Sequence, residues 1–255
     1  MTGRFDLGRH TTESLRALVA AGAPVVALVP VGSVEPHGPH LSLLTDVVIS
    51  QGACERAATR LAGQGLAPLI APAVAYGVTD CAVGFAGAVS VPADVLTAYL
   101  GAIVDGLVAA GCAHVCLVND HLEPAHDAAV RAAIAGAAPG RASVACPLTR
   151  RWARTLSAEF KSGACHAGRY ETSIVLAQDP ALVDDAARAA LPPVPISLSE
   201  QLRAGVGTFA AMGLDRAYAG DPAAATAAEG EDLLDRLAAM IVGEVSEALG
   251  LPAGA

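Results

Sequence analysis

The sequence predicts an α/β domain in which a mostly parallel central sheet is flanked by helices. Short, continuously apolar runs alternate along the chain with longer segments of helical periodicity. This alternation is typical of a parallel sheet that is covered on both faces. The chain of 255 residues is long enough for one large domain. We therefore expect a single layered domain over residues 1–255.

The first half of the chain predicts two strands and three helices. Thr11 or Thr12 can cap the first helix, and Glu13 lies in its first turn. The first strand is a run of apolar residues that Gly32 ends, and the third helix carries one apolar stripe and ends at Gly111. The predicted elements are, in order, helix 12–21, strand 25–31, helix 46–61, strand 67–75, a long glycine-rich loop over 76–92 and helix 93–110.

The second half continues the alternation and then becomes helical. Another short apolar run ends at Asn119, and prolines at 192, 193 and 195 mark an extended connection between the last two helices. The predicted elements are strand 115–118, helix 125–138, strand 143–147, helix 168–178 and helix 228–249.

Composition excludes several classes of protein. A hydrophobic fraction of 53% and a mean hydropathy of +0.48 exclude a largely disordered chain. The longest apolar stretch, around residues 24–31, is shorter than the roughly 20 residues that cross a bilayer. With 16 basic against 25 acidic residues and a single lysine, Lys161, the chain has no basic surface of the kind that binds nucleic acid. The charged residues of the opening segment are unlike a secretory signal, and the six scattered cysteines are typical of reduced, buried thiols. We expect a soluble cytoplasmic protein without a nucleic-acid or membrane partner.

Two clusters of metal-ligand residue types begin where predicted strands end. The first runs from Gly32 to Asp46 and the second from Asn119 to His126, and together they hold four of the seven histidines. Imidazole and carboxylate are the usual ligands of Zn²⁺, Mn²⁺ and Fe²⁺. Ligands in parallel sheets gather at the carboxyl ends of the strands. The pattern favours a metal site over the alternative of two ordinary polar surface loops.

The residues around these clusters resemble the creatininase (creatinine amidohydrolase) family. The resemblance rests on Val29-Pro-Val-Gly-Ser-Val-Glu-Pro-His-Gly-Pro-His-Leu with Thr45-Asp46, on Val118-Asn119-x-His121, on His166-Ala-Gly-Arg-Tyr-Glu171-Thr-Ser173, and on shorter matches at 76–77, 84–87, 220–222 and 229–230. It implies a single α/β domain and two divalent metal ions per chain, zinc or manganese with iron as a further possibility. It also implies hydrolysis of a non-peptide carbon–nitrogen bond, usually in a homo-oligomer, with a hexamer expected.

The resemblance also implies a role for each matching residue. The metal ligands would be Glu35, His37, Asp46, His121 and Glu123, with Asp46 as the bridging carboxylate. His166 would be the catalytic proton-transfer histidine, and Glu171 a supporting carboxylate at the same site. Glu123 or Glu171 could move the proton in its place.

Some positions depart from relatives and bear on the substrate. The stretch Asp120-His-Leu-Glu-Pro resembles the His-x-Glu members more than those that read Gly-His-Gly-Gly-Asn. Creatininase itself has a glutamate where this chain has Cys165, and it presents tryptophans to its substrate where this chain has only Trp152. We therefore expect a member other than creatininase itself, with Cys165, Trp152, His40 and His126 as candidate substrate contacts.

Three functions follow from this pattern. The first is a metal-dependent amidohydrolase that uses a metal-activated water on a cyclic amide or formamide of a small molecule. The second is a biosynthetic enzyme that uses the same site for peptide trimming or for the reverse, lactam-forming reaction. The third is a metal-binding scaffold without catalysis, which the complete ligand set disfavours.

Overall fold

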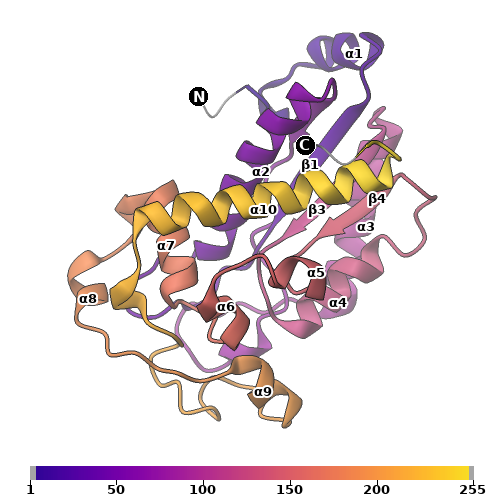
Figure 1. Cartoon of the computed structure of the whole chain (residues 1–255). Coiled ribbons are helices and arrows are strands. Elements are labelled where there is room, and N and C mark those ends of the chain that lie inside the picture. Colours follow the sequence, from indigo (N-terminus) through magenta and orange to yellow (C-terminus); the bar gives the residue numbers. More distant parts are fainter. Residues whose placement is uncertain (1–3, 253–255) are drawn as a thin grey trace.

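Four parallel strands form the centre of the protein (Figure 1). The computed structural model describes residues 4–252, so the first and last three residues of the predicted domain 1–255 lie outside the described residues. The strands are β1 (Val25–Val31), β2 (Ala67–Ile70), β3 (His114–Asn119) and β4 (Ala142–Ala145), in the order β2-β1-β3-β4. Because all neighbours are parallel, their carboxyl ends meet at one edge of the sheet.

Helices cover both faces of this sheet, as Figure 1 shows. The α-helices are α1 (Thr12–Ala20), α2 (Thr45–Gly63), α3 (Ala93–Ala109), α4 (Pro124–Ala133), α5 (Arg150–Ala153), α6 (Ala158–Ser162), α7 (Arg169–Gln178), α8 (Asp185–Ala189), α9 (Leu198–Arg203) and α10 (Ala227–Ala248). Helices α2, α7 and α10 pack on one face, while α1, α3 and α4 pack on the other. The architecture is therefore the predicted single α/β domain with a parallel sheet between helical layers.

Strand β1 shows why a continuous apolar run was needed. Its side chains alternate between the two faces, so that Val26 and Leu28 join the core under α2 and α10, whereas Val25, Ala27 and Val29 join the core under α3. Every residue of the strand is buried. Burial on both faces is the environment that the apolar pattern predicted.

The predicted elements differ from the structure mainly in their ends. Strand β2 stops at Ile70 instead of residue 75, because Pro72 has no amide hydrogen for the ladder and only Val74 returns to form one bridge with Val31. Helix α4 stops at Ala133 instead of residue 138, before a segment that contains Gly136 and Pro139. Helices α5, α6, α8 and α9, of four to six residues, were not predicted, because so few residues carry no periodicity.

The loops at the carboxyl edge of the sheet position the polar clusters. The segment after β1 leads into α2, the segment after β3 leads into α4, and α7 begins close to both. None of the helices in the described part of the chain has both the length and the apolar character to cross a membrane.

Candidate metal centre

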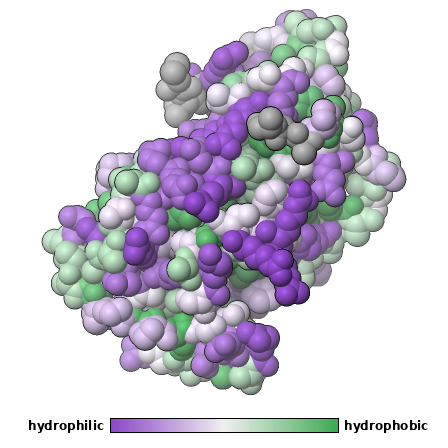
Figure 2. Space-filling model, in the orientation of Figure 1, coloured by the Kyte–Doolittle hydropathy of each residue, from purple (hydrophilic) through white to green (hydrophobic). Residues whose placement is uncertain are grey.

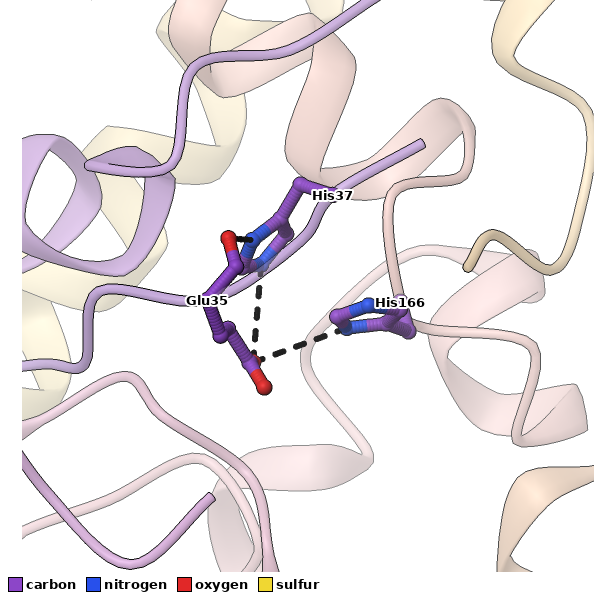
Figure 3. Close-up of side chains that lie close together, drawn as sticks. All are labelled: Glu35, His37 and His166. Atoms are coloured by element: carbon purple, nitrogen blue, oxygen red, sulfur yellow. Dashed lines mark hydrogen bonds and ion pairs between the residues drawn. The ribbon is translucent and has the colours of Figure 1, made fainter. Parts of the chain in front are cut away.

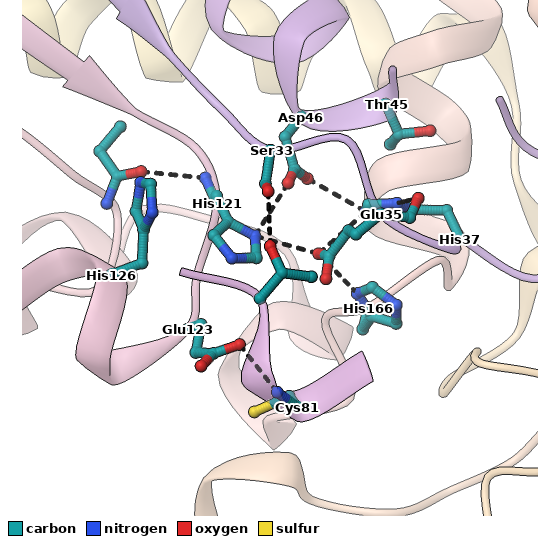
Figure 4. Close-up of polar contacts among 12 residues, drawn as sticks. Ser33, Glu35, His37, Thr45, Asp46, Cys81, His121, Glu123, His126 and His166 are labelled. Carbon is teal, nitrogen blue, oxygen red and sulfur yellow. Dashed lines mark hydrogen bonds and ion pairs between the residues drawn. The ribbon is translucent and has the colours of Figure 1, made fainter. Parts of the chain in front are cut away.

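Six buried side chains from four segments converge at this edge of the sheet (Figure 4). The loop after β1 provides two of them, the first turn of α2 one, the loop after β3 one, and the segment that opens α7 the last two. They are Glu35, His37, Asp46, His121, His166 and Glu171. All six were predicted as site residues, and the structure brings them together.

Glu35, Asp46 and His121 form the first set of possible ligands. His121 Nδ1 lies 3.0 Å from Glu35 Oε1 and 2.9 Å from Asp46 Oδ2. The other ring nitrogen, Nε2, donates a hydrogen bond of 2.7 Å to the carbonyl oxygen of Val78. That bond fixes the ring so that Nδ1 faces the carboxylates, which is the usual arrangement of a metal-binding histidine.

His37, Asp46 and Glu171 form the second set. His37 Nε2 lies 3.0 Å from Asp46 Oδ1 and 3.5 Å from Glu171 Oε2. Its Nδ1 donates to the backbone carbonyl of Glu35 at 3.1 Å, which again leaves the other nitrogen facing the carboxylates. Asp46 contributes Oδ2 to the first set and Oδ1 to the second. One carboxylate therefore joins the two sets, as a bridging ligand would.

The pKa values show how strongly this site attracts positive charge. Burial disfavours a charged His37, yet the carboxylates of Asp46, Glu171 and Glu35 outweigh burial and raise its pKa to about 10. The pKa of His121 is also raised against burial, by Glu35 and Asp46. Burial would raise the pKa of Asp46, but the two histidines lower it. Glu171, where burial and the nearby Asp46 act together, has a pKa raised to about 8.

The donor set fits divalent cations. In each set one ligand atom per residue lies within 4.8 Å of the others. Glu35 Oε2 is buried without a hydrogen-bond partner, and the short contacts of His37 Nε2 and Asp46 Oδ2 lack hydrogen-bond geometry. Buried polar atoms without a partner are costly unless they are paired or coordinate a metal. Neutral imidazole with carboxylate suits Zn²⁺, Mn²⁺ and Fe²⁺.

His166 lies beside the first set rather than within it (Figure 3). Its Nε2 donates a 2.9 Å hydrogen bond to the carbonyl oxygen of Pro36, and its Nδ1 faces Glu35 Oε1 at 3.8 Å. The ring of Phe209 stacks against it with centroids 4.4 Å apart. Burial and the neighbouring His37 lower the pKa of His166 to about 4. A neutral ring with a free lone pair on Nδ1 is therefore directed at the centre.

Glu123, predicted as a fifth ligand, lies apart from both sets. Its oxygens accept backbone N–H groups from Asp80 at 3.1 Å and Cys81 at 3.0 Å, and Figure 4 shows it directed at Cys81. It still lines the cavity in front of the centre. Glu171, predicted as a supporting carboxylate, occupies the place beside His37 and Asp46 instead.

Of the four predicted substrate contacts, the structure brings only Cys165 to the cavity. His40 donates or accepts at 2.9 Å with the hydroxyl of Thr172 on α7, and His126 accepts from the backbone N–H of Val78 behind the ring of His121. Both side chains are buried outside the cavity lining.

Trp152 lies on α5, away from the cavity lining. Its indole N–H donates 2.5 Å to Glu244 on α10. The ring packs between α5 and α10, directly over Gly243, where a β-carbon would lie 2.8 Å from the ring. The expectation that Trp152 faces the substrate is therefore not supported.

A cavity of about 470 Å³ opens in front of the two ligand sets. Acidic and histidine side chains form its floor, and its walls are largely apolar. The apolar wall residues are Leu122, Leu148, Leu198, Leu202, Phe209 and Met212. Four of them come from α9 and the segment that follows it, which the sequence predicts only as part of the connection between the last two helices. A leucine pair at 198 and 202 was the only signal there, and it is too short to be distinctive.

The family model described as creatininase, creatinine amidohydrolase, matches residues 9–245. The chain belongs to the creatininase family. It is accordingly a metal-dependent amidohydrolase, an enzyme that hydrolyses carbon–nitrogen bonds. The family thus supports an enzyme over a metal-binding scaffold without catalysis.

Similarity to individual proteins extends over the whole chain in one case and over half of it in another. The chain is 34% identical to the mycofactocin precursor peptide peptidase of Mycobacterium tuberculosis (strain ATCC 25618 / H37Rv), over 98% of this chain and 94% of that protein. It is 30% identical to the creatinine amidohydrolase of Pseudomonas putida, over 48% of this chain and 47% of that protein. The similarity to the peptidases therefore extends over almost the whole chain, whereas the similarity to that creatinine amidohydrolase extends over about half of it.

Solved structures confirm the fold. A crystal structure of creatinine amidohydrolase (creatininase) superposes with a TM-score of 0.73 at 23% identity, covering 98% of this chain and 99% of that one. A structure of a creatinine amidohydrolase homologue from Bacteroides fragilis NCTC 9343 gives a TM-score of 0.73 at 20% identity, covering 100% of both chains. Manganese and zinc forms occur among the creatininase structures.

Proposed function

We propose that the protein hydrolyses a non-peptide carbon–nitrogen bond, in a cyclic amide or formamide of a small molecule, with two divalent metal ions. The observation that carries this proposal is the position of Asp46, whose two oxygens face two separate ligand sets at the floor of one cavity. Zinc or manganese is the expected pair, and iron suits the same donors.

Each residue of the centre would have a separate role in amide hydrolysis. Glu35 and His121 would hold one ion, His37 and Glu171 the other, and Asp46 both. Metal ions bound there supply a water of lowered pKa and polarise the substrate carbonyl. His166, neutral and with Nδ1 free, would accept a proton from the attacking water and return it to the leaving nitrogen.

The hydrogen bond from His166 Nε2 to the carbonyl oxygen of Pro36 determines which ring nitrogen would transfer the proton. Because Nε2–H is committed to a carbonyl, only Nδ1 can exchange a proton with the substrate. The ring of Phe209 packs against one face of the imidazole, so it would hold the ring in this orientation and exclude water from that face. Glu123, on the same cavity wall, could take over the proton if the histidine were lost.

Peptide trimming is the second candidate, favoured by one observation. The similarity at 34% identity over 98% of the chain is to proteins named as peptide peptidases. The cavity of about 470 Å³ accommodates either a small ring or the end of a peptide. The reverse, lactam-forming reaction would use the same groups.

Creatinine itself is expected to be a poor substrate. Cys165 replaces the glutamate expected in creatininase, and the only tryptophan, Trp152, lies outside the cavity. A flat, polar ring would thus meet mostly aliphatic walls. Ring opening at the rate of a dedicated creatininase would contradict this reading.

The protein would act in the cytoplasm as a homo-oligomer, with a hexamer expected from the family resemblance. All six cysteines are free in the described structure, which suits a reducing compartment. Exposed Tyr76, Val95 and Tyr99 line one shallow apolar hollow of the kind that subunit contacts cover. Light scattering on purified protein measures the assembly directly.

The deciding experiment combines metal analysis with a substrate screen. Protein prepared without chelator should contain up to two transition-metal ions per chain by elemental analysis. Metal-loaded protein incubated with pools of small amides and of peptides should produce gain of water or loss of a formyl group in one pool, detected by mass spectrometry. Absence of Zn, Mn and Fe, or hydrolysis of peptides alone, would refute the first candidate function.

A further inference from the structure

A second hollow adjoins the catalytic cavity and is lined by basic side chains. It measures about 340 Å³ and shares Leu148, Cys165 and Ser199 with the catalytic cavity. Its basic side chains are Arg150 on α5, Arg154 at the C-cap of α5, and Lys161 on α6. Arg203 at the end of α9 is the one basic residue that lines the catalytic cavity itself. We call these four side chains the basic groove.

The concentration of positive charge in this groove is unusual for the molecule. The chain carries a net charge of −9 and only 16 basic residues, of which four lie here. Figure 2 shows strongly hydrophilic surface over α5, in the orientation of Figure 1. No acidic residue lines the second hollow.

These cations are not neutralised within the described chain. Between residues 4 and 252, none of the four has a carboxylate within 4.0 Å, whereas Arg151, next to Arg150 in sequence, pairs with Glu247 on α10. Arg203 uses Nε for the backbone carbonyl of Ser199 at 2.9 Å, so its two terminal nitrogens stay available. Like charges that gather without counter-charges are complementary to an anionic ligand.

The shape of the groove selects an elongated ligand. The cations line two joined hollows instead of a single one, and apolar Leu148, Ala153 and Phe160 line the second hollow with them. A compact phosphate would reach one or two of them, whereas a chain with several carboxylates could reach all four. Arg and Lys at an open rim bind carboxylates while apolar surface packs the chain between them.

We infer that the substrate is an amide within, or at the end of, an acidic peptide-like chain, whose carboxylates occupy the basic groove while its scissile bond lies at the metal centre. This inference rests on the proposed function for the reaction and favours its peptide-trimming form. Arg203 lines the catalytic cavity and is bonded to the backbone of Ser199, which lines both hollows, so it would contact the part of the substrate nearest to the bond that is cleaved.

Binding of two matched peptides to metal-loaded protein tests this inference without requiring turnover. One probe is a fluorescein-labelled, N-acetylated octapeptide with three glutamates, and the other has glutamines at the same positions. Each exposed ion pair contributes a factor of roughly 1.5 to 5, so three pairs should make the acidic peptide bind about tenfold more tightly. The preference should fall as salt rises, because the groups are exposed.

The double variant Arg150→Gln/Arg154→Gln should lose most of this preference, and Arg203→Gln should lose part of it. The double variant Arg16→Gln/Arg141→Gln is the matched control, since it removes the same charge from residues outside the groove. The control should retain the preference. Melting temperatures confirm that every variant is folded, and the comparison of the two peptides on the unaltered protein needs no variant.

Three outcomes would overturn the inference. Equal affinity for the two peptides, or an equal loss in the groove and control variants, would remove the specific role of the groove. Displacement of the acidic peptide by tripolyphosphate at lower concentration than by the unlabelled peptide would assign the groove to a phosphorylated ligand instead. A fourth outcome separates the two proposals. Acidic-peptide binding without hydrolysis of any amide would refute the proposed function but not the binding of acidic chains in the basic groove.

Discussion

Which carboxylate completes the second ligand set can be decided by two substitutions of the same kind. Glu171→Gln and Glu123→Gln each exchange one carboxylate oxygen for an amide nitrogen and keep the length of the side chain. Glu171 lies with His37 and Asp46 in the structure, whereas Glu123 accepts backbone N–H groups from Asp80 and Cys81. We expect the two variants to fail in different ways.

Glu171→Gln should lose one of the two metal ions. Its amide oxygen can still accept the 2.6 Å hydrogen bond from the backbone N–H of Ala167, but no negative oxygen then remains for the metal. Removing even an outer partner of a metal ligand typically weakens binding about 10- to 100-fold, so loss of a direct donor should exceed that. Elemental analysis after dialysis should show one ion per chain.

Glu123→Gln should instead destabilise the fold and keep both ions. Its two oxygens each accept one backbone N–H, and an amide can accept only one of them, so one charge-assisted bond of about 2 kcal/mol is lost. At about 2–4 °C per kcal/mol for a chain of this size, the melting temperature should fall by about 4–8 °C.

Glu159 provides the matched control for the second variant. It is a partly buried carboxylate that accepts backbone N–H groups from Tyr170 at 2.8 Å and Asp221 at 2.7 Å, and it is not part of either ligand set. Glu159→Gln should lower the melting temperature by a similar amount with unchanged metal content. If Glu123→Gln loses an ion while Glu171→Gln retains two, the assignment of the second set is wrong.

Four further substitutions test other parts of the structure. His166→Ala should keep its metal and lower turnover by about 10²–10⁴, whereas His121→Ala should lose metal and activity together; unchanged turnover in the first variant would remove that residue from the mechanism. Trp152→Phe should leave kcat/KM unchanged on any amide substrate and cost about 1 kcal/mol of stability through its lost hydrogen bond to α10, measured by urea unfolding; a changed kcat/KM would return this residue to the substrate site. Gly230→Ala should unfold the protein or cost more than about 3 kcal/mol, because the added methyl group would lie 1.8 Å from the backbone oxygen of Ser173; a melting curve like that of the parent protein would contradict the packing of α10 on α7.

The sheet and its main helices were predictable because burial restricts which residue types these elements contain. A strand buried on both faces must be apolar throughout, and Val25–Val31 is found at the predicted bounds. Helices α3 and α10 were long enough for a stripe of apolar residues to repeat several times. Helices α5 and α9 are too short for such repetition, and their positions depend on contacts with distant segments.

The candidate ligands could be identified in the sequence because metal chemistry restricts residue type. Glu35, His37, Asp46 and His121 stand out as imidazoles and carboxylates at two strand ends, where a parallel sheet gathers its loops. The walls of the cavity carry no such restriction. A leucine such as Leu202 looks the same in a sequence whether it faces the core or a substrate, and only the path of α9 places it in front of the centre.

Residue type alone does not tell which of two glutamates, Glu123 or Glu171, lies with the candidate metal ligands. Both are buried acids within five residues of a histidine, and the family resemblance predicts Glu123 as a ligand and Glu171 as a supporting carboxylate. What separates them is the supply of hydrogen-bond donors around each carboxylate. The turn at Asp80 and Cys81 directs one N–H group at each oxygen of Glu123, whereas Glu171 accepts one N–H, from Ala167, at Oε2, the same oxygen that lies 3.5 Å from His37 Nε2. A carboxylate that the backbone already satisfies gains less from a metal than one that faces a histidine and a second acid across a buried gap. We therefore expect the backbone of the loop over 76–92, which the sequence describes only as rich in glycine, to decide which of the two acids completes the centre.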